Sequence, residues 1–173
     1  MVYKLNDIKT ILNNTPGVLN SLLYNLPDEL INSNEGEKTW SPKEVLGHLI
    51  CGEKSDWIKR TKIILEQGAT ATFPPFDMDF QYSYVQNKTV SELLDEFDNL
   101  RKNNLAELEG LNLSENDIIK TAKHPRLGSV TMKELLSTWA VHDLGHIAQI
   151  SRIISKQYKS DTGPWSNQLR ILN

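Results

Sequence analysis

The chain has 173 residues and a formal net charge of -3, with 39% hydrophobic and 24% charged residues, a balance typical of a globular protein that buries a core without disulfides. The negative charge and the lack of a Lys/Arg run argue against a nucleic-acid partner, and no segment has the roughly 20 consecutive apolar residues of a membrane span. We expect a single domain over residues 1–173.

Helix starts are marked along the chain by capping patterns. Residues 41–44 read Ser-Pro-Lys-Glu, with a capping serine, a proline at the first helical position and a glutamate three residues after the cap. Residues 89–92 and 131–134 repeat the serine/threonine and glutamate pair, and Thr15 followed by Pro16 is a weaker cap. Each pattern precedes a segment with the apolar periodicity of a helix.

In chain order, this periodicity predicts a short helix at 5–12, long helices at 16–26, 42–67, 90–108 and 131–157, and another short helix at 115–121. No segment indicates a convincing strand. Four long amphipathic helices predict an all-α protein, a four-helix bundle.

A long aromatic-rich loop at 68–88 separates the second and third helices of this bundle. It contains two adjacent prolines, Pro74 and Pro75, and five Phe or Tyr residues. A connection of this length is usually functional or carries structure of its own. We expect it to pack across one end of the bundle as a lid, and it is also a candidate wall of a ligand pocket.

The last long helix carries two histidines four residues apart, His142 and His146. Residues at this spacing lie about 40° apart around a helix and about 6 Å apart along it, so their imidazoles can converge on one metal ion. The apolar stripe of the helix passes through both positions, so both rings are expected to face the bundle interior.

The second long helix supplies a third histidine on its buried face, His48. Gly47 and Gly52 flank it, and Gly145 lies between the other two histidines; glycine inside a helix often marks the close approach of another backbone or a ligand. A lone His48 would be read as a hydrogen-bonded core residue. Three histidines in apolar stripes of two helices instead predict one divalent metal ion bound by His48, His142 and His146. Imidazole ligands favour Zn or Ni over Fe or Mn.

Three further residues near this pattern have open roles. Asp143 is predicted to be a carboxylate that supports a metal ligand from behind or lies at the surface, with a general base as the alternative. Cys51, the one cysteine, excludes an internal disulfide and is expected to be a small core residue, with a fourth ligand or a reactive thiol as alternatives. His124 is expected to help cap the bundle from a loop. The lone cysteine and a polar N-terminus unlike a signal peptide favour the cytoplasm.

Three stretches together resemble the DinB/YfiT-like superfamily, in its DinB-like domain members. They are TWSPKEVLGHL at 39–49, HPRLGSVT at 124–131 and WAVHDLGHIAQI at 139–150, in the order and at the separations of that family. The resemblance covers nearly the whole chain. It implies an up-down-down-up bundle, often a homodimer, and a metal site made by His48, His142 and His146.

The resemblance also implies a function. Characterised relatives include transferases that use the thiols bacillithiol or mycothiol, so we expect a metal-dependent S-transferase with a low-molecular-weight thiol as its small-molecule partner. The alternatives are a metal-dependent hydrolase, a non-catalytic metal or ligand binding protein, and a metal that only stabilises the bundle. For a dimer, the sequence offers Trp165 and the aromatics of the long loop as contact surface.

Overall fold

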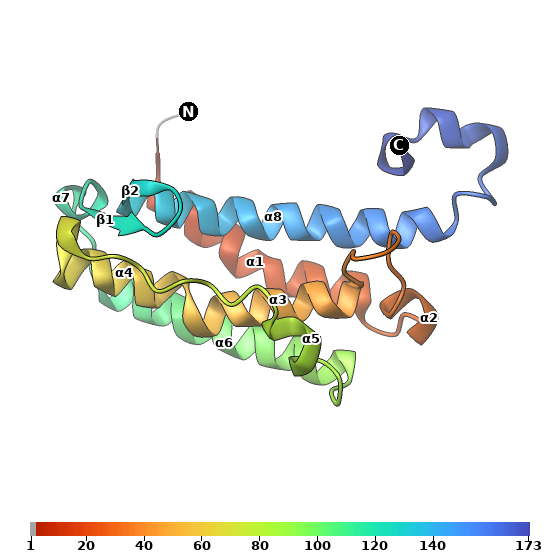
Figure 1. Ribbon diagram of the computed structural model, residues 1–173, viewed down its shortest axis with the longest axis horizontal. Helices are drawn as coiled ribbons and strands as arrows, with labels where there is room; N and C mark the ends of the chain where they lie inside the picture. The colour runs from red at the N-terminus through yellow and green to blue at the C-terminus, as the bar shows by residue number, and fades with distance from the viewer. Residues whose placement is uncertain (1–2) are drawn as a thin grey trace.

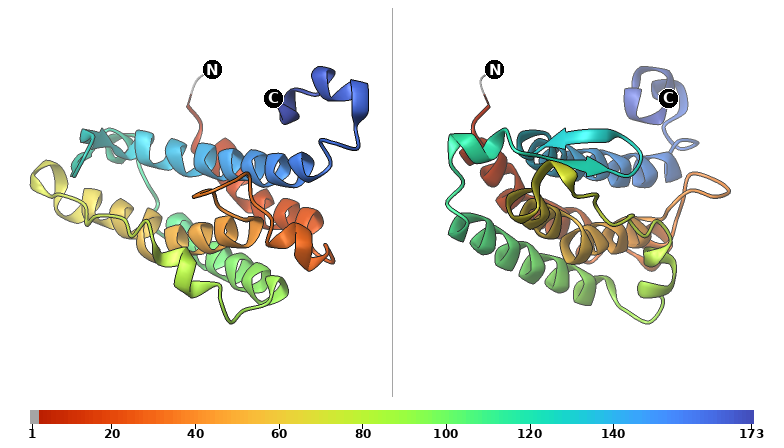
Figure 2. Two further views of the ribbon diagram at one scale, coloured as in Figure 1. Left: turned by 45° about the vertical axis from the view of Figure 1, so that its right-hand side comes forward. Right: turned by 60° about the vertical axis from the view of Figure 1, so that its left-hand side comes forward.

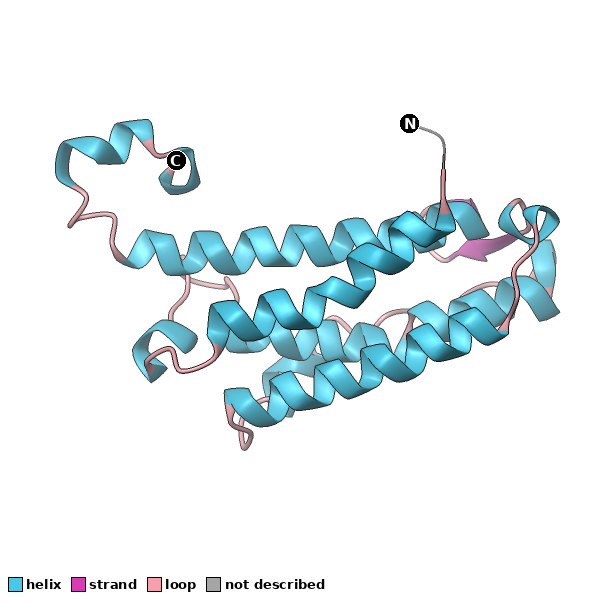
Figure 3. Ribbon diagram, turned by 180° about the vertical axis from the view of Figure 1, so that it is seen from behind, coloured by secondary structure: helices cyan, strands magenta, loops and turns pink. Residues whose placement is uncertain are grey.

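In the computed structural model, which describes residues 3–173, four long helical rods lie side by side (Figure 1). The rods are α1 (Leu5–Leu23), α3 (Pro42–Ser55) continued by α4 (Trp57–Glu66), α6 (Val90–Gly110) and α8 (Met132–Gln157). The shorter elements are α2 (Asp28–Ile31), η1 (Gly68–Thr70), α5 (Phe80–Tyr84), α7 (Glu115–Ile118), β1 (Thr121–His124), β2 (Gly128–Thr131), η2 (Gly163–Gln168) and η3 (Arg170–Leu172). The predicted four-helix bundle is confirmed, and Figure 3 shows from behind that helix dominates the fold.

The rods follow the up-down-down-up order that the resemblance implied. In Figure 1, α1 and α8 run in one direction, whereas α3–α4 and α6 run in the other. Because the second and third rods run the same way, the chain between them has to return along the length of the bundle. The connection therefore lies beside α4 and α3, with α5 packed on α3, and the predicted position across one end of the bundle is wrong (Figure 2).

The three predicted capping boxes are present in the structure. The side chains of Ser41, Thr89 and Thr131 each accept a hydrogen bond from a backbone N–H three residues later. The glutamate at that third position accepts one in return from the backbone of the cap. These local bonds satisfy N–H groups of the first turn, which explains why the starts of α3, α6 and α8 were predictable from sequence.

The predicted break near Pro16 is wrong, because α1 is one helix with Pro16 inside it. Thr15 does not cap a helix; its hydroxyl donates to the Ile11 carbonyl at 3.1 Å. Proline has no N–H, so the Leu12 carbonyl four residues earlier loses its usual helical partner. Nη1 of Arg101 donates to that carbonyl at 2.7 Å, so the defect of one helix is filled from another.

Arg101 joins all four rods at one buried point. It belongs to α6 and is 1% exposed, and besides the Leu12 carbonyl of α1 it binds Asp143 of α8 at 2.6 and 3.2 Å and Glu53 of α3 at 2.8 Å. Asn104 and Trp139 each donate a further bond to Glu53, at 2.9 and 3.0 Å. Each charge therefore has partners that compensate for its removal from water, as buried ions require.

The second rod is interrupted, so the prediction of one helix over 42–67 is wrong. The chain bends at Asp56, which has φ -114° and ψ -77°, between the end of α3 and the start of α4. The bend turns Trp57 back over Gly52, where an added Cβ would lie 2.9 Å from Trp57 Nε1.

A small antiparallel hairpin, β1–β2, occupies the stretch predicted to be an irregular loop. Thr121 pairs with Thr131 and His124 with Gly128. The connection after α4 adds to it, because Lys123 exchanges backbone hydrogen bonds with Ala71 and Phe73, both at 2.8 Å. Four-residue strands that need a distant segment as partner leave little periodic signal in a sequence.

Two further expectations concern membrane spans and the oligomeric state. No helix of residues 3–173 is both long and apolar enough to cross a membrane. The homodimer stays a prediction, since the structure holds one chain. Exposed apolar side chains at Val18 of α1 and at Val141 and Leu144 of α8 offer a contact surface that the sequence analysis did not identify.

The helical glycines differ in what surrounds them. An added Cβ at Gly47 would lie 2.5 Å from Val85 Cγ1 and 3.2 Å from Gln81 Cβ, so glycine lets α5 approach α3. Gly145 has no protein atom of this kind within 4 Å, so the close approach of another backbone expected there is wrong.

We expect Gly47→Ala to destabilise the fold by roughly 1–3 kcal/mol through overpacking. Gly145→Ala should stabilise it by up to about 1 kcal/mol, because alanine is the better helix former and meets open space. Urea unfolding followed by circular dichroism, in chelator to remove any bound metal, measures both. Equal changes in the two variants would contradict the packing argument.

Candidate metal centre

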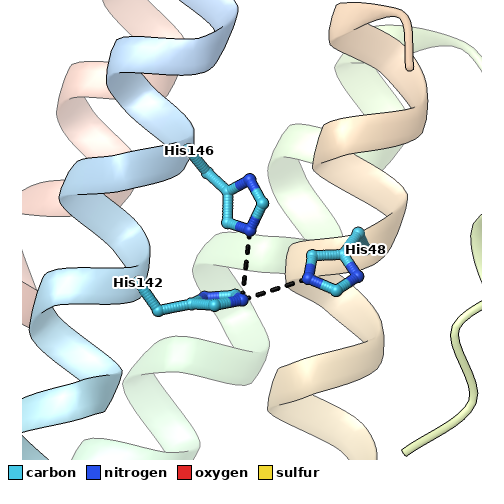
Figure 4. Close-up of side chains that lie close together, drawn as sticks. All are labelled: His48, His142 and His146. Carbon is cyan, nitrogen blue, oxygen red and sulfur yellow. Dashed lines mark hydrogen bonds between the residues drawn. The ribbon is translucent and has the colours of Figure 1, made fainter. Parts of the chain in front are cut away.

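Three histidines converge between α3 and α8. His48 comes from α3, and His142 and His146 stand one turn apart on α8 (Figure 4). The Nε2 atom of His142 lies 3.0 Å from that of His48 and 3.1 Å from that of His146. The three nitrogens all lie within 4.8 Å of one another. The inward orientation expected from the apolar stripes thus brings three potential ligand atoms to one point.

Burial keeps these imidazoles neutral. His48 is buried and the other two are half-buried. Burial, aided by the neighbouring imidazoles, lowers the pKa of His48 from 6.5 to about 4 and that of His142 to about 3. Burial also lowers the pKa of His146, although its bond to Gln149 acts in the opposite direction. At neutral pH all three rings retain a nitrogen lone pair, which is the form that binds a metal.

Hydrogen bonding alone does not satisfy this cluster. The Nε2 atom of a neutral ring is either a donor or an acceptor, so the Nε2 of His142 cannot bond well to both of its neighbours. An ion bound at the Nε2 atoms would remove this conflict and leave each ring proton on Nδ1. Nδ1 of His48 and Nδ1 of His142 are buried with no partner among the described residues. Nitrogens that share a tetrahedral Zn²⁺ lie about 3.3 Å apart, given Zn–N bonds of about 2.0–2.1 Å. The observed separations fit a divalent ion.

The rings are held by neighbours that sequence reasoning did not identify. Oε1 of Gln149 lies 2.8 Å from Nδ1 of His146. Because Gln149 follows His146 by three residues on the same helix face, this contact could have been predicted from helical spacing. The ring of Trp40 lies 4.7 Å from that of His48, and the ring of Trp57 lies 5.2 Å from that of His142. The ring of Phe76, from the connection between the second and third rods, lies 5.2 Å from that of His48 in an edge-to-face contact.

Asp143 is fully buried, so the option of a surface carboxylate is wrong. Both of its oxygens bind Arg101, and none of its hydrogen bonds reaches the three imidazoles. The expected role of Asp143 in supporting a metal ligand stays a prediction. Asp143 directly follows His142 in the chain, and its bonds to Arg101 connect α8 to α6.

The three histidines lie on the wall of a pocket with a volume of about 510 Å³. Most of its surface is apolar and aromatic, and a basic side faces it from α4 and the hairpin. The pocket is lined by Trp40, His48, Asp56, Trp57, Arg60, Pro75, Phe76, Met78, His124, Pro125, Arg126, His142 and His146. The connection between the second and third rods thus walls the pocket, and His124, expected only to cap the bundle, lines it too.

Cys51 is buried on α3 and lies outside both the histidine cluster and the lining of this pocket. Its Sγ atom lies 3.6 Å from the Ser55 hydroxyl, and burial raises the pKa of its thiol. These surroundings are those of a small core residue rather than a reactive thiol.

A family model, a sequence relative and a solved structure are similar to this chain. A family model described as the DinB superfamily matches residues 11–150. A protein of Oceanobacillus iheyensis named "Putative metal-dependent hydrolase" is 23% identical over 154 residues, covering 88% of this chain and 85% of its own length. A solved structure, described as "YfiT from Bacillus subtilis is a probable metal-dependent hydrolase with an unusual four-helix bundle topology", matches with a TM-score of 0.75 at 20% identity, over 91% of this chain and 90% of that one.

Removing one histidine of the cluster should abolish metal binding. We expect purified protein to bind about one divalent ion per chain and His146→Ala to bind none at micromolar ion, because two imidazoles hold an ion far less tightly than three. Calorimetric titration and elemental analysis measure this. His124→Ala is the control, since it removes the one histidine outside the cluster; an equal loss in both variants would mean that the ligands are misassigned.

The metal-free protein should lose stability as the pH falls from about 6.5 through about 4. The unfolded chain takes up protons on His48 and His142 in this range, whereas the folded chain, with its lowered pKa values, does not, so protons favour unfolding. The melting temperature of chelated protein at several pH values tests this. The double variant His48→Asn/His142→Asn should show a shallower fall, and an unchanged slope would refute the assignment.

Proposed function

The chain belongs to the DinB superfamily, and from that premise we propose that it is a metal-dependent enzyme whose single divalent ion is bound by His48, His142 and His146. One observation carries the proposal: three neutral imidazoles meet with Nε2 separations of 3.0 and 3.1 Å on the wall of an apolar pocket. Three protein ligands leave coordination positions open, and imidazole ligands favour Zn or Ni. When bound, such an ion supplies Lewis-acid chemistry and lowers the pKa of a small nucleophile, a thiol or a water.

We favour a thiol as the nucleophile, with transfer to an electrophile bound against the aromatic walls. A free thiol has a pKa of about 8.5, and a metal ion that lowers this pKa would let the thiol lose its proton near neutral pH without help from a strong base. Asp56 is the one carboxylate among the described residues that line the pocket, and it forms an ion pair with Arg60. A pocket whose one carboxylate is already ion-paired suits a thiol of the bacillithiol or mycothiol type, as the family resemblance implies.

Hydrolysis is the second candidate. The names of the two similar proteins favour it, and it requires a base that takes a proton from water. Burial raises the pKa of Asp56 to about 6 even though Arg60 opposes the shift, which puts this carboxyl in the range of a general base. In a hydrolase, Asp56 would take that proton, whereas thiol transfer does not need it.

Reaction rates with two substrate types separate these candidates. We expect protein loaded with zinc to accelerate the reaction of a small thiol with 1-chloro-2,4-dinitrobenzene, and the metal-free protein and His142→Ala to be slower by orders of magnitude. Cys51→Ala should react at the rate of the wild type, because the small thiol carries the nucleophile. A rate that varies little with pH near neutrality would fit a thiol held as its thiolate.

The second arm uses a p-nitrophenyl ester and Asp56→Asn, with zinc binding as the check that the site is intact. If the ester is hydrolysed and Asp56→Asn abolishes only that reaction, the protein is a hydrolase. If zinc accelerates neither reaction, the protein binds metal without catalysis, and the proposed enzyme is wrong.

A further inference from the structure

The fourth histidine, His124, presents one fixed hydrogen-bond donor at the pocket. Its Nδ1 accepts the backbone N–H groups of Arg126 and Leu127, both at 3.2 Å, across the turn of the hairpin. A ring nitrogen that accepts carries no proton, so the proton of the neutral ring is on Nε2. His124 lines the same pocket as the three clustered histidines, and the hairpin therefore sets its tautomer as well as its position.

Arg60 lies close to His124 and has donors to spare. Its Nε pairs with Asp56 and its Nη2 donates to the Pro74 carbonyl at 3.3 Å, which leaves the other N–H groups of the guanidinium without a bond to any of residues 3–173. Phe73 connects the two side chains: its ring centre lies 5.0 Å from the Arg60 guanidinium carbon and 6.4 Å from the ring of His124.

The charge of the pocket is opposite to that of the whole chain. Its lining has two guanidinium groups, Arg60 and Arg126, against the single carboxylate of Asp56, whereas the whole chain carries -3. The rest of the lining is mainly aromatic or apolar. A local positive field between apolar walls attracts anions and strengthens each polar contact made there.

We infer that Arg60, His124 and Arg126, the basic wall of the pocket, bind a carboxylate carried by an otherwise apolar substrate. The apolar body would lie against Trp40 and Phe76, beside the three histidines. The inference takes this pocket to be the substrate site, as in the proposed function, but the recognition itself does not need the metal. Many ligand pockets are mostly apolar and use a few polar groups at defined positions to orient the ligand and to select it.

Binding of a matched ligand pair tests the basic wall. We would measure the affinities of 2-naphthoate and of neutral 2-naphthamide by tryptophan fluorescence and by calorimetry, with zinc-loaded and with chelated protein. Naphthoate should bind at least tenfold more tightly than the amide in both forms, because only naphthoate offers a charged acceptor to the basic wall.

Two variants remove single contacts of the wall while keeping the fold. In His124→Asn the amide oxygen can still accept the backbone N–H groups of the turn, but the donor in the pocket is lost. Arg126→Gln removes an exposed charge of the hairpin, and Lys123→Gln removes the same charge from an exposed residue that does not line the pocket. We expect about tenfold weaker naphthoate binding in His124→Asn, at least threefold weaker binding in Arg126→Gln, no change in Lys123→Gln, and unchanged naphthamide binding throughout.

Three results would overturn the inference: no preference for naphthoate, equal effects of Arg126→Gln and Lys123→Gln, or a preference present only with zinc. The last would mean that the ion and not the basic wall binds the carboxylate. A chain that prefers naphthoate but binds no zinc would instead support the basic wall and refute the proposed metal enzyme, so the two failures are distinguishable.

Discussion

The buried guanidinium of Arg101 is the contact on which the rest of this bundle depends. Close-packed apolar stripes hold the helices together, and a buried charge adds a sharper constraint, because losing one of its partners costs about 3–5 kcal/mol. Arg101 binds Glu53 of α3 and Asp143 of α8, and these lie five residues after His48 and one residue after His142. A polar contact between residues close in sequence to His48 and His142 therefore helps to set how α3 and α8 align where the two histidines meet.

The Arg101 contact also explains why α1 continues through a proline. A proline in the interior of α1 leaves the Leu12 carbonyl without a helical donor, which usually costs about 3 kcal/mol or more. Here the freed carbonyl is a ligand of Arg101, and the continuous helix persists because a different rod supplies the donor. Local rules favoured a break at Pro16, and only the tertiary contact explains why none occurs.

Local patterns predicted well the features that are themselves local. Capping boxes gave the helix starts, and helical phase placed His142 and His146 toward the interior. The pairing with His48 also followed from phase, because each buried stripe faces the same core. The partners of Arg101 were not predictable in this way: an arginine on an amphipathic helix usually lies in solvent, and its sequence neighbours do not reveal two carboxylates on other helices. The bend at Asp56 and the hairpin also depend on contacts between distant segments.

Because the second and third rods run in the same direction, the pocket is lined partly by the connection between them and partly by the bundle itself. The returning connection has to run beside α3, and it therefore supplies Pro75, Phe76 and Met78 to the pocket while contributing none of the three clustered histidines. Substitutions at Pro75 or Met78 alter the shape of the pocket without removing a partner of Arg101 or one of the clustered histidines. Proteins with this topology can therefore diverge in substrate through one segment while the bundle and its histidine cluster stay the same.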